Sequence, residues 1–116
     1  MDERALGGIL GLAMKAGQLV KGAEKSVLLV RDKKAAMVLL DGNASENTQK
    51  RVQDACRHYN VPLTIQKPGL LAQACGQAEM AAAAIKPGHL ADRLRLITLD
   101  EHNPNPNETK IAEDVG

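Results

Sequence analysis

Aromatic side chains are nearly absent from this 116-residue chain, which contains one tyrosine, Tyr59, and no tryptophan or phenylalanine. The core must therefore be packed from leucine, valine, isoleucine, methionine and alanine. Modules that bind single-stranded RNA stack unpaired bases on aromatic side chains, and one tyrosine cannot build such a platform. If the protein binds nucleic acid, we expect it to recognise shape, backbone or a few extruded bases.

Cysteine and long apolar runs are also scarce. Cys56 and Cys75 have no CxxC spacing and no signal peptide is recognisable, so we expect both to be reduced residues of the core. The longest apolar run, around residues 5–14, is too short and too rich in glycine to cross a membrane. These absences predict a cytoplasmic protein that does not interact with a membrane.

The familiar patterns of catalysis are missing as well. The glycines of the first predicted helix follow no strand, so they do not form a dinucleotide-binding fingerprint, and no GxxxxGK[ST] phosphate loop occurs. The histidines His58, His89 and His102 have no carboxylate or cysteine companions at metal-ligand spacing. No serine or cysteine lies in a nucleophile elbow. We therefore expect no enzymatic activity, no metal site and no cofactor.

The formal net charge of +1 conceals an uneven distribution. Residues 1–99 contain 14 Lys/Arg and nine Asp/Glu, whereas residues 100–116 contain one and five. The net charge of about +5 on residues 1–99 is compatible with a polyanionic partner but does not require one. The acidic segment 100–116, rich in proline and asparagine, is expected to be a disordered tail.

Hydrophobic periodicity predicts alternating helices and strands. On the second helix, Val27, Leu28 and Val30 are expected to face the core. The alternation favours one α/β domain over residues 1–99, built as an α/β/α sandwich. Helices are expected at 3–16, from Gly22, at 46–59, at 69–75 and around Leu90–Ile97, and strands at 19–21, 36–40, 62–66 and, less clearly because of its alanines, 80–85.

The start of the second helix is the one feature that indicates a binding site. The first N–H groups of a helix have no internal partners and carry partial positive charge. Gly22 lets a phosphate approach them closely, and Lys15, Lys21 and Lys25 surround the position with cations. The same residues also fit an ordinary glycine N-cap with surface lysines, so this pattern alone leaves both interpretations open.

A series of motifs along residues 6–99 resembles a known family. The motifs are Leu10-Gly11-Leu12-Ala13 with Lys15 and Ala16, Lys21-Gly22, the run LLDGNASENT at 39–48, Cys56, Tyr59-Asn60-Val61-Pro62 and the run LAQACG at 71–76. In this order they resemble the L7Ae/L30e ribosomal protein superfamily, closest to its small bacterial YlxQ-type branch. The resemblance implies a three-layer fold with a small mixed central sheet. It also implies a non-enzymatic, monomeric, ribosomal-type RNA-binding protein.

Members of this superfamily bind structured RNA at kink-turns, so the resemblance names a kink-turn-like motif in ribosomal RNA or a messenger leader as partner, with the ribosome as a candidate assembly. It places the RNA at the start of the second helix, the loop after the strand at 36–40 and the loop after Gly76. Residues 43–46 and 77–79 would line an extruded base. The implied RNA-binding residues are Lys15, Lys21, Gly22, Ala23, Glu24, Lys25, Arg31, Asn43, Ser45, Glu46, Gln77, Ala78 and Glu79.

The chain departs from the Gly-x-Asn-Glu-x-x-Lys signature with which such proteins read the sheared guanines of the kink. Gly22 matches, but Glu24 replaces the asparagine, Lys25 the glutamate and Leu28 the lysine. Glu79 is expected to repel RNA. The elements that position phosphates are therefore kept while those that read bases are not. A protein-interaction module that kept the fold and lost the RNA site is the alternative, and exposure of Leu28 within an apolar patch would favour it.

Overall fold

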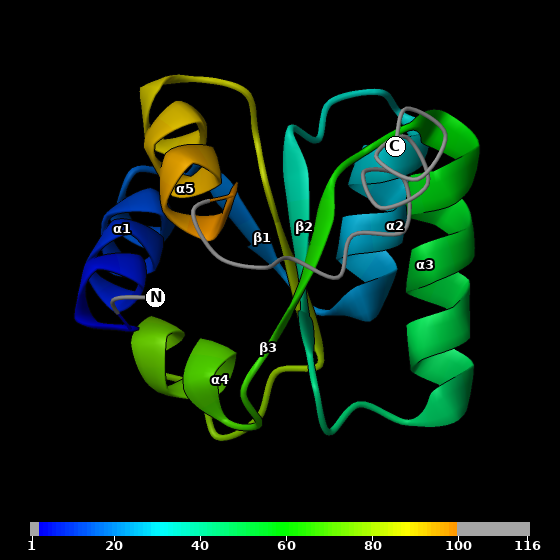
Figure 1. The fold of residues 1–116 in the computed structure, drawn as a ribbon, viewed down its shortest axis with the longest axis horizontal. Coiled ribbons are helices and arrows are strands. Elements are labelled where there is room, and N and C mark those ends of the chain that lie inside the picture. The colour runs from blue at the N-terminus through cyan, green and yellow to red at the C-terminus, as the bar shows by residue number, and fades with distance from the viewer. Residues whose placement is uncertain (1–2, 100–116) are drawn as a thin grey trace, which may run out of the picture.

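Four strands form one mixed sheet in the order β1-β4-β2-β3, in which β2 and β3 are parallel and the other pairs antiparallel (Figure 1). The structure is a computed structural model that describes residues 3–99. Its elements in chain order are α1 (Glu3–Lys15), β1 (Leu19–Lys21), α2 (Ala23–Arg31), β2 (Met37–Asp41), α3 (Glu46–Tyr59), β3 (Leu63–Gln66), α4 (Leu70–Cys75), β4 (Ala82–Ile85) and α5 (His89–Leu99).

The sheet lies between two helical layers (Figure 1). Helices α1, α4 and α5 cover one face, and α2 and α3 cover the other, each over its own cluster of buried side chains. The predicted three-layer α/β/α sandwich with a mixed sheet is confirmed. The alanine-rich segment does form a strand, β4, between β1 and β2. Its residues Ala82–Ala84 are fully buried, because small side chains let both helical layers approach the centre of the sheet.

Strand directions bring distant loops to one end of the sheet. Lys21 at the end of β1 pairs with Ala83, Leu40 near the end of β2 pairs with Ala82, and Asp41 pairs with Gln66 at the end of β3. The loops that follow β1, β2 and β3 therefore meet the loop that precedes β4. We call this end the loop edge; it comprises residues 21–25, 41–46, 69–72 and 77–81.

The prediction that Leu28 faces the core is wrong. Val27 and Val30 are buried, but Leu28 is 57% exposed. Each helical residue turns by about 100°, so a helix that buries positions 26, 27 and 30 directs position 28 outward. The residues three and four positions away are all charged: Glu24, Lys25 and Arg31 in α2, and Asp32 at its C-cap.

The segment 100–116, predicted to be a disordered tail, lies outside the described residues. Within residues 3–99, no helix is long and apolar enough to span a membrane.

Candidate functional site

Gly22 sets the direction in which α2 begins. Its backbone has φ 97° and ψ 154°, a conformation that only glycine adopts readily. Its N–H donates to the carbonyl of Ala82 at 2.8 Å, and its carbonyl accepts from the N–H of Ser26 at 3.0 Å. No side chain caps this helix. The N–H groups of its first turn are therefore without helical partners at the loop edge.

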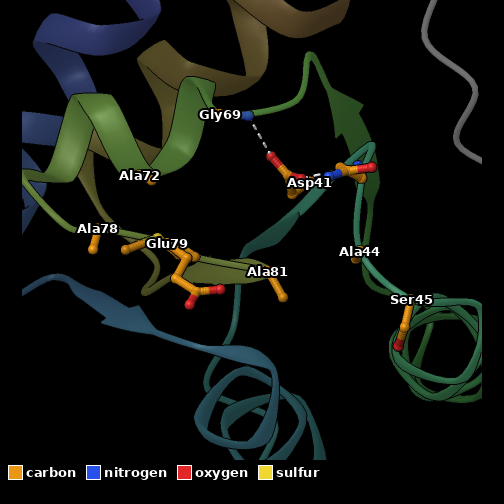
Figure 2. A pocket seen from close by; sticks show the side chains of 10 residues that line it. Asp41, Ala44, Ser45, Gly69, Ala72, Ala78, Glu79 and Ala81 are labelled. Atoms are coloured by element: carbon orange, nitrogen blue, oxygen red, sulfur yellow. Dashed lines mark hydrogen bonds between the residues drawn. The ribbon is translucent and has the colours of Figure 1, made fainter.

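Asp41 joins two loops of the edge (Figure 2). Asp41 is 8% exposed, and its carboxylate accepts hydrogen bonds from the N–H of Asn43 and the N–H of Gly69, each at 2.9 Å. Asp41 was not among the residues predicted from the sequence. An aspartate directly after an apolar strand and before Gly-Asn is typical of a side chain that bonds the backbone of its own turn, and that signal could have found it.

The β2–α3 loop is held by close backbone packing. Gly42 donates its N–H to the carbonyl of Gln66 at 2.8 Å, and a Cβ at Gly42 would lie 2.9 Å from that same oxygen. Ser45 then caps α3 by accepting from the N–H of Thr48 at 3.2 Å. The loop is thereby fixed against β3 at one end and against α3 at the other.

Two adjacent hollows occupy the loop edge. The first, of about 320 Å³, is lined by Asp41, Asn43, Ala44, Ser45, Gly69, Ala72, Ala78, Glu79, Met80 and Ala81 (Figure 2). The second, of about 370 Å³, is lined by Lys21, Gly22, Ala23, Glu79, Met80 and Ala81. Segment 79–81 belongs to both hollows and separates the start of α2 from the β2–α3 loop. Gly69, Ala72, Met80 and Ala81 were not among the predicted site residues, because they carry no functional group and enter through the fold alone.

The structure brings most of the predicted RNA-binding residues together. Lys21, Gly22, Ala23, Asn43, Ser45, Ala78 and Glu79 line the two hollows. Glu24 and Lys25 lie exposed in the first turn of α2, and Glu46 is the exposed first residue of α3. Gln77 is exposed, and its N–H donates to the carbonyl of Ala72 at 2.8 Å.

Lys15 and Arg31 lie elsewhere. Lys15 ends α1 just before β1 begins, and Leu19 pairs with Ile85, so Lys15 lies at the opposite end of the sheet from Lys21. Arg31 is the last residue of α2, and a nine-residue helix is about 13 Å long. Neither residue lines a hollow of the loop edge.

The charges of the loop edge do not favour an anion. Lys21 and Lys25 are outnumbered by four acidic residues, Glu24, Asp41, Glu46 and Glu79. The side chain of Glu79 points from its loop toward the segment between β1 and α2, where it lines the same hollow as Lys21 and Gly22 (Figure 2). An RNA phosphate at the start of α2 would meet favourable N–H groups and an unfavourable carboxylate.

Reactive and metal-binding groups are not prominent in residues 3–99. No group of three histidine, cysteine or acidic side chains in this range is arranged to hold a metal ion. Cys56 and Cys75 are buried and unpaired. Burial raises the pKa of the Cys56 thiol to about 12 and also raises the pKa of Cys75, against which the nearby charge of Lys21 acts.

The sandwich and its loop edge place the protein in a defined class. A sequence model of the ribosomal protein L7Ae/L30e/S12e/Gadd45 family matches residues 4–93, and the chain belongs to this family. The resemblance to the YlxQ-type branch is confirmed by two curated relatives, both named RNA-binding protein YlxQ. The one from Bacillus subtilis is 32% identical over 87 residues, 74% of this chain and 87% of that protein. The one from Enterococcus faecium is 44% identical over 54 residues, 47% of this chain and 52% of that protein.

Solved structures share the fold of this chain. A Bacillus halodurans protein of unknown function, 29% identical in sequence, superposes with a TM-score of 0.76 and covers 83% of this chain and 97% of its own. A Giardia lamblia 15.5kD RNA-binding protein has a TM-score of 0.65 over 80% of this chain and 79% of its own. At 16% identity, the latter likeness establishes the shared fold.

Proposed function

We propose that this protein is a non-enzymatic binder of structured RNA and that its loop edge contacts a kink-turn-like motif. Membership of the L7Ae/L30e/S12e/Gadd45 family and two relatives named as RNA-binding proteins support RNA as the ligand. One structural observation carries the proposal. The uncapped start of α2 lies beside a hollow of about 320 Å³ that the β2–α3 loop and the segment before β4 build together.

In this proposal, phosphate and base bind to different parts of the edge. A backbone phosphate binds the N–H groups of the first turn of α2, and Lys21 adds a cation. An extruded base enters the hollow of about 320 Å³, where Asn43 and Ser45 present polar groups to its edge. Asp41 acts indirectly, because its two hydrogen bonds hold the wall of this hollow.

This chain must contact the bases of the kink differently from family members that have the full Gly-x-Asn-Glu-x-x-Lys signature. The carboxylate of Glu24 accepts hydrogen bonds from guanine donors but repels phosphate. Lys25 donates to the guanine O6 and N7 acceptors. Leu28 donates nothing. We therefore expect weaker discrimination among kink sequences than a full Gly-x-Asn-Glu-x-x-Lys signature would give.

The alternative function, a protein-interaction module without RNA binding, has less support. Leu28 is exposed, as that alternative requires, but its neighbours on α2 are charged and do not extend it into an apolar patch. Leu12 and Leu96, the other large exposed apolar side chains of the described chain, belong to the opposite helical layer. Single exposed leucines are ordinary features of protein surfaces.

A calorimetric titration tests the proposal. A hairpin that contains a kink-turn should bind more tightly than the same hairpin with the kink closed by Watson–Crick pairs. Binding should weaken with salt, and Lys21→Ala should reduce the slope of log affinity against log salt by about 1. Arg93→Ala, an exposed change on α5, is the matched control. Equal and weak binding of both hairpins would contradict the proposal.

The remaining predictions about partners follow from the same proposal. Ribosomal RNA or a messenger leader is the expected source of the motif, in the cytoplasm and with the protein as a monomer. Crosslinking in cells followed by sequencing of the bound RNA identifies the source. Recovery of RNA without kinked motifs would exclude the kink-turn part of the proposal.

A further inference from the structure

A further hollow lies away from the loop edge, between α2 and α3. It has a volume of about 530 Å³ and is lined by Arg31, Arg51, Asp54, Ala55, His58 and Tyr59. We call it the α2–α3 groove. Arg51, Asp54, Ala55 and His58 are three or four positions apart, so one stripe of α3 forms one wall. Arg31 enters from the end of α2, at the opposite end of that helix from Gly22.

The two arginines of the α2–α3 groove are available to a ligand. Arg31 and Arg51 are exposed, and neither forms an ion pair or side-chain hydrogen bond with any residue between 3 and 99. The one acidic side chain in the groove, Asp54, is paired with Arg57 at 3.2 Å. The groove therefore presents two unpaired guanidinium groups, whose planar donors match the oxygens of a phosphate.

The distribution of charge favours an anion at this groove over the loop edge. Residues 3–99 contain 14 Lys/Arg and eight Asp/Glu, a surplus of six positive charges. The segments 31–34 and 50–58, which flank the α2–α3 groove, contain six Lys/Arg and two Asp, a surplus of four. The loop edge has two lysines and four acidic residues, a deficit of two. The two segments that flank the groove therefore have a formal net charge of +4, whereas the loop edge has one of −2.

We propose that the α2–α3 groove binds the sugar–phosphate backbone of the same RNA whose kink contacts the loop edge. This inference rests on the proposed function. An RNA held at the start of α2 has its backbone about 13 Å, the length of that helix, from Arg31. The loop edge then recognises the shape of the RNA. The groove supplies the attraction between cations and phosphates that the acidic loop edge lacks.

Salt dependence tests this role, because each phosphate neutralised by the protein releases a counterion. The probe is a kink-turn hairpin with an extended stem, and its affinity is measured from 50 to 200 mM salt for the full chain. Removing two phosphate contacts by Arg31→Ala with Arg51→Ala should lower the slope by about 2. The unmodified chain should then lose about tenfold more affinity over this range than the double variant.

Two matched variants separate the groove from general charge effects. Arg93→Ala with Arg95→Ala removes the same charge from exposed positions on α5, in the opposite helical layer, and should leave the slope unchanged. Arg31→Lys with Arg51→Lys keeps the charge at the groove and should restore most of the slope. Urea unfolding of each variant checks that the fold is retained.

The outcomes distinguish this inference from the proposed function. If the unmodified chain does not prefer the kinked hairpin, the proposed function fails. If it prefers the kinked hairpin while the groove and α5 variants have equal slopes, only the inference about the groove is overturned. The inference is also overturned if the groove variants keep the RNA slope but lose binding to poly-glutamate, because the groove would then suit an acidic protein segment.

Discussion

The carboxylate of Asp41 accepts a hydrogen bond from the N–H of Gly69 at 2.9 Å, although 28 positions separate the two residues in sequence. The other carboxylate oxygen accepts from the N–H of Asn43. One side chain therefore fixes the β2–α3 loop relative to the start of α4. These two segments form facing walls of the hollow of about 320 Å³ (Figure 2).

The first prediction concerns this link. Asp41→Ala removes the acceptor for two backbone N–H groups and should lower the free energy of unfolding by about 1.5–3 kcal/mol. It should also weaken RNA binding, because the walls of the hollow are no longer held together. Urea unfolding and RNA titration measure the two effects. Asp92→Ala on α5, where the side chain is exposed, should change stability by less than about 0.5 kcal/mol. Equal effects of the two variants would contradict a special role for Asp41.

Gly22 provides the second prediction. Gly22→Ala meets no steric obstacle, since nothing lies within 4 Å of the added Cβ, but φ 97° and ψ 154° are unfavourable for alanine. The variant should therefore be less stable by about 1–3 kcal/mol. Gly8→Ala is the matched control, because Gly8 is an exposed residue inside α1 with equally free space. That change should stabilise the protein by about 0.5–1 kcal/mol. Thermal or urea unfolding that moves both variants in the same direction would refute the explanation.

The third prediction concerns electrostatic repulsion at the loop edge. Glu79→Gln removes a carboxylate beside Gly22 and Lys21 while keeping the size of the side chain. RNA affinity should rise about two- to fivefold at low salt, with a smaller gain as salt increases. Asp92→Asn, the same type of change on α5, should have little effect. A loss of affinity in Glu79→Gln would mean that the carboxylate accepts a hydrogen bond from the RNA.

The buried thiol of Cys56 provides a prediction about alkaline pH. Burial raises its pKa from 9.0 to about 12, so the unfolded chain loses this proton at lower pH than the folded protein. The resulting contribution to stability is complete below about pH 9 and is lost between pH 9 and 12. Cys56→Ala lowers stability by a core truncation that does not depend on pH. The difference in unfolding free energy between the unmodified chain and this variant should therefore narrow above pH 9, and a constant difference would contradict the assignment.

The fold was largely predictable because its signals are local. Apolar runs, helical periodicity and the glycines at Gly22 and Gly76 define elements within a few residues of their observed bounds. Leu28 was misplaced because Val27 and Val30 alone do not fix the rotation of a nine-residue helix. The neighbours Ser26 and Leu29 decide that rotation: Ser26, a polar residue, is buried, and Leu29 is partly buried.

The parts of the candidate site that belong to a sequence motif were predictable. The parts that depend on how distant elements lie relative to one another in the fold were not. The start of α2, the β2–α3 loop and the loop after α4 meet as the family resemblance implied. Lys15 was placed with them because it is close in sequence to Gly22, but β1 separates the two positions along the sheet. Asp41 and the α2–α3 groove emerge only from contacts between elements that are distant in sequence.

Backbone amide shifts of the labelled protein, recorded while a kink-turn hairpin is added, test RNA binding at the loop edge most directly. RNA binding at the loop edge predicts that the largest shifts occur at residues 22–25, 43–45 and 78–81, with small shifts along α5. Largest shifts along α1 and α5, or no shifts with a hairpin concentration well above that of the protein, would contradict it.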